Sequence, residues 1–213
     1  NLEITSIQNK ALELSLFLSI PATVALFVAS NLIVSALFGY GSFSEASVQN
    51  SALALFYFAF GLPAFALIKV FSSFFFARQD TKTPFYISLV SVLLNVIISV
   101  TLFQKLGFII IPIATSISSW LNAIALYIFS RKRKFFIFND IFIYRFPRIL
   151  FSSLITGLIF YFLLDLLNFK LIYSESLKLV YLLLCISITL ICYLLISIFT
   201  KAFKMSDIKL NYK

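Results

Sequence analysis

The chain has 213 residues, of which 62% are hydrophobic and only 12% are charged, and its mean hydropathy is +1.05. A water-soluble domain carries about 25% charged residues, so this chain has too few polar side chains to cover a surface that faces water. The net charge of +9 does not indicate nucleic-acid binding, because the cations stand in short connectors between apolar runs, where anionic membrane leaflets attract them. The composition therefore predicts an integral membrane protein.

Six apolar stretches follow one another along the chain. They cover residues 14–38, 51–76, 85–103, 109–129, 149–167 and 179–199. Each is long enough for a helix that crosses a hydrocarbon core about 30 Å thick, which takes about 20 residues. A membrane β-barrel would instead show alternating segments of about ten residues. The sequence therefore predicts an all-α, polytopic membrane protein with six transmembrane helices.

The cations between these stretches predict the orientation of the chain. With the N-terminus in the cytoplasm, three of the 17 Lys and Arg residues would face outward, namely Lys105, Lys170 and Lys178. Lys69 lies inside a stretch, and the remaining 13 would lie on the cytoplasmic side. Because cytoplasmic loops carry the excess of Lys and Arg, we expect both termini in the cytoplasm.

Lys69 is the only cation inside an apolar stretch. It lies about two turns from the cytoplasmic end of the second stretch, so its ammonium group either reaches the membrane interface or faces a water-filled cavity. Pro63 precedes it in the same stretch, and Pro21 lies in the first. Each proline removes a backbone hydrogen bond, which predicts a kink in its helix.

The polar segment RQDTKT, which begins at Arg78, separates the second and third stretches. Asp80 and Thr81 can accept hydrogen bonds from the free N–H groups of the next helix, and Pro84 suits its first turn. Arg78 and Lys82 would fix the orientation and are candidates to contact anionic lipid. We interpret the segment as a capped turn, a gate element at the cytoplasmic face, or both.

Polar side chains form a stripe at helical spacing on each of the third and fourth stretches. They are Ser88, Ser91, Asn95 and Ser99 on one, and Thr115, Ser118, Ser119 and Asn122 on the other. We expect the two stripes to face each other or a shared cavity. Two interpretations remain open: contacts that join membrane helices, and a cation site with oxygen ligands from Asn95, Ser99 and Thr115.

The last two stretches show no such stripe, which predicts helices that face lipid, and Cys185 and Cys192 are interpreted as small lipid-facing residues. The sequence has no His, no Gly-rich phosphate loop and no pair of carboxylates in one stretch. It therefore predicts no catalytic centre, no metal site and no cofactor apart from a cation at the polar stripes.

A cationic and aromatic segment, RKRKFFIFNDIFIYRFPR (131–148), follows the fourth stretch. Its composition is typical of a segment that lies in the membrane interface. The run at 131–134 is either a topology anchor or a specific site for a lipid headgroup. We therefore divide the chain into residues 1–134 with four helices, an interfacial linker at 135–148, and a two-helix hairpin with a basic cytoplasmic tail at 149–213.

The segment GLPAFALIKVFSSFFFARQDTKTPFYISLVSVLLNVIISV (61–100) resembles the MurJ (MviN) family of lipid II flippases. That family shows a pattern close to K-V-L, small residues, F-Y-A-R-x-D-T-K-T-P at a cytoplasmic turn. The matching residues are Lys69, Val70, Phe75, Ala77, Arg78, Asp80, Thr81, Lys82, Thr83 and Pro84. Residues 15–44 and 106–129 are similar to the neighbouring helices of the family, while the last two stretches fit by position and hydropathy only.

The resemblance implies a partial flippase fold of the multidrug/oligosaccharidyl-lipid/polysaccharide exporter superfamily. Residues 1–134 would be the last four helices of the second lobe, and the final hairpin would form a groove for a polyprenyl tail. Lys69, Arg78, Asp80 and Lys82 would line the substrate cavity or its gate, where Arg78 and Lys82 would be candidates to contact a pyrophosphate. The first lobe has no counterpart here, so we expect the rest of the same protein to supply it.

The resemblance further implies translocation of the undecaprenyl-pyrophosphate-linked peptidoglycan precursor across the bacterial inner membrane. It implies alternating access coupled to the membrane potential or to a monovalent cation. The cations beside the apolar stretches predict anionic phospholipids as further partners. The alternatives are another flippase or multidrug exporter of the superfamily, and a membrane assembly subunit that transports nothing. We expect the first four helices to pack together, with the last two leaning outward toward lipid.

Overall fold

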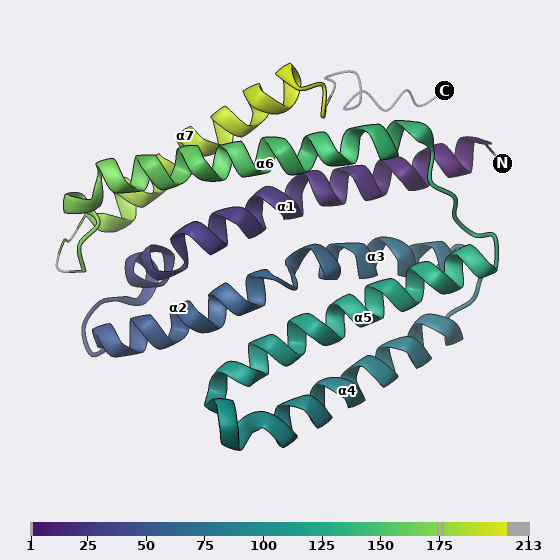
Figure 1. Ribbon diagram of the computed structural model, residues 1–213, viewed down its shortest axis with the longest axis horizontal. Helices are drawn as coiled ribbons and strands as arrows, with labels where there is room; N and C mark the ends of the chain where they lie inside the picture. Colours follow the sequence, from purple (N-terminus) through teal and green to yellow (C-terminus); the bar gives the residue numbers. More distant parts are fainter. Residues whose placement is uncertain (1, 174, 176, 204–213) are drawn as a thin grey trace. The chain divides into compact units, whose positions relative to one another are not determined.

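The computed structural model describes residues 2–173, 175 and 177–203, and every regular element within them is a helix (Figure 1). The α-helices are α1 (Leu2–Phe38), α2 (Glu45–Ala59), α3 (Leu62–Phe76), α4 (Lys82–Leu106), α5 (Ile110–Lys132), α6 (Asp140–Leu166) and α7 (Lys178–Phe199). Two 3-10 turns are η1 (Gly107–Ile109) and η2 (Asn168–Lys170). The predicted all-α class is confirmed, and the helices overlap all six apolar stretches.

Four of the described segments are long and apolar enough to span a membrane, or five when the bent pair α2 and α3 counts as one span. One of these segments, Lys82–Lys132, contains both α4 and α5. Within it the chain reverses at Gly107, whose φ of 61° lies in the left-handed region that glycine adopts without strain. As a result, α4 and α5 lie side by side (Figure 1), and the Asn95 side chain of α4 donates a hydrogen bond to Thr115 of α5.

The second apolar stretch forms two helices, α2 and α3, which are bent by 41° at a short break. Gly61 stands at the break, and Pro63 follows in the first turn of α3, where a missing N–H removes no helical bond. The predicted bend is confirmed, but Pro63 starts a helix rather than interrupting one. In α1 the non-helical residue is Ala29, at φ −121°, whereas the helix continues through Pro21.

The described chain divides into two compact units. The first contains the residues up to 19 together with 53–139, and the second contains 20–52 together with the residues from 140 onward. Helices α1 and α2 therefore contribute to both units. The expectation that the first four apolar stretches pack together apart from the last two is wrong, because residues 20–38 belong with α6 and α7. The lobes assigned to 1–134, 135–148 and 149–213 stay a prediction.

Aromatic rings fill the first unit where α3 and α5 end. The rings of Phe74 and Phe136 stack with centroids 5.4 Å apart, and Phe138 packs edge-on against Phe136 at 4.8 Å. Phe136 is only 1% exposed, so the start of the predicted interfacial linker belongs to the core. The rest of that linker differs as well, since α6 begins at Asp140, whose carboxylate favours a helix N-terminus.

Small and polar residues on one face of α6 are buried in the second unit. They are Ser152, Ser153, Thr156 and Gly157. A Cβ at Gly157 would overlap with Cγ1 of Val24 on α1, so the close approach of these two helices requires glycine. The prediction that the last two stretches carry no small-residue stripe is therefore wrong for α6.

The apolar core of the second unit joins residues of α1, α6 and α7. Ala29 and Ala36 of α1 cluster with Phe160 of α6 and with Leu182 and Cys185 of α7. Cys185 is 0% exposed, so it is a core residue and not a lipid-facing one. The sulfhydryl acts here as a small apolar group where three helices meet.

Candidate functional site

The predicted polar segment lies where α3 and α5 end. We call this region the cationic corner; it comprises residues 78–83 and 131–137. Each helix is followed by a residue with left-handed backbone, Gln79 at φ 59° and Lys134 at φ 57°. The next N–H then bonds the carbonyl five residues back, at 3.0 Å for Asp80 and 2.8 Å for Phe135. Both helices therefore end in the same hydrogen-bonded motif, which satisfies their last carbonyls.

Asp80 links the start of α4 to the end of α5. Its Oδ1 accepts a hydrogen bond from the backbone N–H of Thr83 at 3.1 Å, and its Oδ2 forms an ion pair with Arg133. Capping by Asp80 is confirmed, whereas Thr81 makes no side-chain cap bond, and Pro84 lies in the first turn as predicted. Burial would raise the pKa of Asp80, but the bonds from Thr83 and the Arg133 charge outweigh it and lower this pKa below its ordinary value.

Arg78 binds the ends of both helices through their backbone. Its Nη1 donates to the Phe74 carbonyl at 2.8 Å, and its Nη2 donates to the Phe135 carbonyl at 3.1 Å. The guanidinium also lies 4.5 Å from the centroid of the Phe135 ring. Carbonyls at a helix C-terminus carry partial negative charge, so they stabilise the arginine. Within the described residues, the charge of Arg78 meets carbonyls and a ring, and no carboxylate.

Lys69 and Lys82 are the other two predicted cavity or gate residues. Lys69 is exposed on α3 and lines an open groove of about 360 Å³, shared with Ser15 and Leu18 of α1. Lys82 is exposed at the first position of α4. In the described part of the chain, no hydrogen bond or ion pair joins either lysine to Arg78 or Asp80. The roles of these two lysines, and of Arg78 and Asp80, at a substrate cavity or its gate stay predictions.

The polar stripes of α4 and α5 meet, as predicted. Asn95 Nδ2 donates to Thr115 Oγ1 at 3.0 Å, and Asn122 Nδ2 donates to Ser88 Oγ at 3.3 Å. Ser99 Oγ is buried and has no hydrogen-bond partner among the described residues. Interhelical bonds of this kind join membrane helices, so the interpretation as a helix contact accounts for them. The cation site at Asn95, Ser99 and Thr115 stays a prediction.

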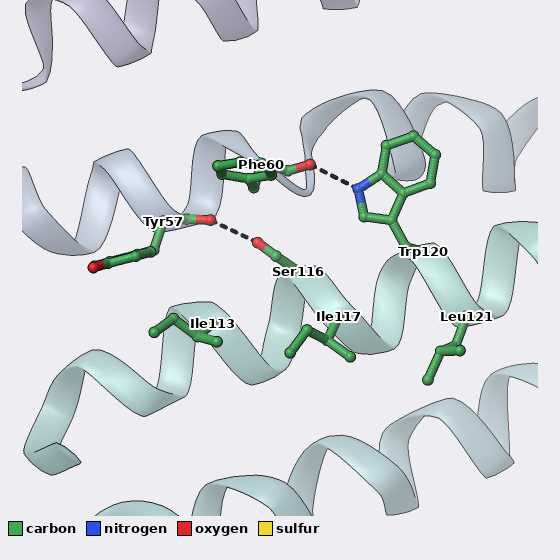
Figure 2. A pocket seen from close by; sticks show the side chains of 7 residues that line it. All are labelled: Tyr57, Phe60, Ile113, Ser116, Ile117, Trp120 and Leu121. Atoms are coloured by element: carbon green, nitrogen blue, oxygen red, sulfur yellow. Dashed lines mark hydrogen bonds between the residues drawn. The ribbon is translucent and has the colours of Figure 1, made fainter.

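Helix α5 also satisfies the backbone at the break between α2 and α3 (Figure 2). Ser116 Oγ donates to the Tyr57 carbonyl at 2.6 Å, and Trp120 Nε1 donates to the Phe60 carbonyl at 2.9 Å. A bend leaves such carbonyls without a helical partner, and lipid offers none. A Cβ at Gly61 would lie 3.1 Å from Ser116 Oγ, so α5 packs close to the break. The sequence predicted the bend but not the two side chains that complete it.

A shallow apolar groove of about 390 Å³ opens beside this break. Figure 2 shows the residues that line it: Tyr57, Phe60, Ile113, Ser116, Ile117, Trp120 and Leu121. The polar atoms of Ser116 and Trp120 are already bonded to backbone carbonyls of α2 and of the break, so the groove presents mainly hydrocarbon. Its surface suits contact with apolar chains rather than with a charged group.

Lys178 forms a second polar cluster, which lies in the second unit. Its Nζ donates to the Gly39 carbonyl at 2.8 Å and to the Tyr173 carbonyl at 2.7 Å. The same atom lies 4.3 Å and 4.6 Å from the ring centroids of Tyr40 and Tyr173, and Lys178 is only 1% exposed. We call this cluster the lysine clasp; it comprises Gly39, Tyr40, Phe43, Tyr173 and Lys178. The sequence marked Lys178 only as a loop cation, because Gly39 and Tyr40, which complete its surroundings, lie far away in the chain.

Comparison with known sequences identifies relatives of this chain. The family model described as "Lipid II flippase MurJ" matches residues 1–182. A "Probable lipid II flippase MurJ" of Rickettsia prowazekii (strain Madrid E) is 39% identical over 127 residues, or 60% of this chain and 25% of the relative. A protein of the same name from Rhizobium meliloti (strain 1021) is 42% identical over 125 residues, or 59% and 23%. That of Rhizobium tropici is 36% identical over 157 residues, or 73% and 29%.

The fold leads to the same family. A solved structure, "Lipid II flippase MurJ, inward closed conformation", matches with a TM-score of 0.74 at 27% identity, and the match covers 93% of this chain and 39% of that one. The chain spans about a quarter of the length of the curated relatives that it matches. Because the family model covers most of the chain, the chain belongs to the lipid II flippase MurJ family.

Proposed function

We propose that this chain forms the C-terminal part of a flippase that moves a lipid-linked peptidoglycan precursor across the membrane. The match of residues 1–182 to the flippase family carries this proposal. Family membership and the apolar helices make the chain part of a multi-pass protein of the bacterial inner membrane. Such a protein is a transporter rather than an enzyme, so its chemistry is binding and release of the lipid and not bond cleavage.

We further propose six membrane crossings with both ends in the cytoplasm. A single helix over Lys82–Lys132 would be about 75 Å long, more than twice the hydrocarbon thickness, so α4 and α5 are better assigned as two crossings. The contacts support the sidedness. The cationic corner joins two connectors that are both predicted to be cytoplasmic, and the lysine clasp joins two that are both predicted to face outward.

Cysteine labelling tests this topology. In a chain with Cys192 replaced by Ser, a cysteine at Ser44 should react with a membrane-impermeant maleimide added from outside. A cysteine at Thr81 should react only after the membrane is opened. Cys185 is buried and serves as the internal background. Reversed accessibility of the two positions would contradict the proposed orientation.

Alternating access needs two helical bundles that move about a central polar site. This chain supplies polar side chains at the groove beside Lys69 and at the stripes of α4 and α5. Further helices must supply the rest of a cavity for a large anionic headgroup. Exposed apolar residues on α6 and α7, such as Leu158, Phe162 and Leu190, offer hydrocarbon for a polyprenyl tail. We therefore propose that α6 and α7 hold the polyprenyl tail, while the helices around the polar cavity close on the headgroup.

A chimaeric transporter tests the function. The matching segment of the Rhizobium tropici relative would be replaced by this chain and expressed in bacteria depleted of their own flippase. Growth and translocation of lipid II in inverted vesicles should be restored, whereas the relative without its segment should restore neither. A chimaera that reaches the membrane at the normal level but translocates no lipid II would contradict the proposal. The chain alone in liposomes should translocate no more than empty vesicles.

We also propose a role for a monovalent cation at the contact of α4 and α5. Asn95, Ser99 and Thr115 present side-chain oxygens there, and Ser99 Oγ lacks a hydrogen-bond partner among the described residues. A hard cation takes about six oxygens, so other helices would have to add ligands. In the chimaera, Ser99→Ala should raise the sodium concentration needed for half-maximal translocation. An unchanged sodium dependence would leave these residues with only their role in helix packing.

A further inference from the structure

The cationic corner contains a pocket that the proposed transport function does not use. The pocket has a volume of about 530 Å³ and lies entirely within the first unit. The start of α1 contributes one wall through Ile4 and Gln8, and the ends of α3 and α5 contribute Arg78, Arg133 and Lys134. Three cations therefore line one cavity in a chain that is otherwise poor in charge.

The cations of the pocket are only partly neutralised. Asp80 forms an ion pair with Arg133, and Arg78 is bound to two carbonyls. The ammonium group of Lys134 is exposed and makes no hydrogen bond or ion pair with any described residue. The partial negative charges at the ends of α3 and α5 offset some of the remaining charge. Two full positive charges without a paired carboxylate remain, which is the electrostatics of an anion site.

Gln8 provides an independent indication of a ligand. It lines the pocket, it is 7% exposed, and its side-chain amide has no hydrogen-bond partner among the described residues. Its amide atoms are not among the fully buried polar atoms that lack a partner, so they are open to the pocket and can bind a ligand there. The amide N–H groups of Gln8 would be satisfied by an anionic oxygen held between Arg78 and Lys134.

The rim of the pocket is apolar. Ile4 and Ile137 line it and remain 52% and 56% exposed. A free anion gains nothing from these two side chains, whereas a lipid places its phosphate in the pocket and its acyl chains over them. We infer that this pocket binds the phosphate of an anionic membrane lipid headgroup in the cytoplasmic leaflet, where anionic lipids are enriched. The inference does not depend on transport of lipid II.

Native mass spectrometry of the full chain in detergent tests the inference, with added phosphatidylglycerol or phosphatidylcholine. Phosphatidylglycerol should bind about tenfold more tightly. Lys134→Gln should weaken the binding of phosphatidylglycerol about fivefold, which is the loss expected when one cation near a lipid phosphate is removed. Gln8→Leu should weaken it by a similar factor of about five through a lost hydrogen bond, with no change in charge. Neither variant removes a contact that holds the corner together, so both should keep the unfolding temperature of the parent chain.

Lys132→Gln is the matched control, because it makes the same change two residues earlier in the same cationic run and outside the pocket. It should change the affinity by less than about twofold. Equal losses at Lys132 and Lys134 would show general surface attraction and overturn the site. An unchanged affinity in Gln8→Leu would do the same. Displacement of the lipid by millimolar inorganic phosphate would show that the ligand is a free anion and not a lipid.

Discussion

Lys178 in the lysine clasp and Lys134 in the cationic corner are both lysines next to a helix end, but their surroundings are opposite. Lys178 is 1% exposed, and its ammonium group binds two carbonyls beneath two aromatic rings. Lys134 is exposed at the mouth of a pocket, and its ammonium group meets no described partner. A buried cation must be satisfied by the fold, whereas an open one remains available to a ligand.

The residues next to the two lysines also differ in how far they are bonded and buried. In the clasp, the Tyr173 hydroxyl donates to the Phe43 carbonyl at 2.6 Å, so the second connector is bonded as well. In the corner, Arg133 is 44% exposed although it pairs with Asp80. The clasp is therefore a structural tie between two connectors. The corner combines a structural part, made by Asp80 and Arg78, with an open cationic surface.

Removal of the buried cation should have the largest effect. Lys178→Met keeps the length of the side chain but leaves the Gly39 and Tyr173 carbonyls without their charged donor. We expect a loss of about 3 kcal/mol in the free energy of unfolding, measured by thermal unfolding in detergent. Lys170→Met, a partly exposed lysine of the same connector, is the control and should cost less than about 1 kcal/mol. Equal losses would remove the distinction between the clasp and an ordinary loop cation.

Substitution in the cationic corner should lower the free energy of unfolding by less. Asp80→Ala removes both the cap of α4 and the partner of Arg133, for which we expect about 1 kcal/mol. Thr81→Ala, at the adjacent position without a cap bond, should change the free energy of unfolding by less than about 0.5 kcal/mol. If the threonine variant were the more damaging of the two, the assignment of the cap would be wrong.

The smallest expected effect concerns pH. The pKa of Asp80 is lowered in the folded chain from its ordinary value of 3.8, so its contribution to stability is present above that value and is lost as the pH falls through the folded pKa. The difference in stability between the parent chain and Asp80→Asn should therefore be constant from pH 7 to about pH 4 and shrink below it. Chemical denaturation at each pH measures it. A difference that grows on acidification would contradict the direction of the shift.

Much of the architecture followed from local sequence. The apolar stretches predicted helices at the right places, because hydropathy over about 20 residues is a property of one segment. The facing stripes of α4 and α5 were predictable from helical spacing and a short connector. The cap at Asp80 was predictable because its acceptor and the N–H of Thr83 are three residues apart. In each case the interacting groups lie in one element or in two neighbouring ones.

The contacts that distinguish the two clusters join distant parts of the chain. Asp80 pairs with Arg133, Lys178 binds the Gly39 carbonyl, and Gln8 lines the pocket of the corner, although no local sequence pattern identifies any of these partners. The burial of Cys185 and of the small face of α6 was missed for the same reason. Segment hydropathy does not tell a helix surface that faces lipid from one that faces another helix, because both are apolar. By itself, the sequence determined which segments are helical and where charge gathers. Only the tertiary structure decided which cations are bonded within the fold and which remain available to a ligand, because this depends on carbonyls and rings that folding brings together.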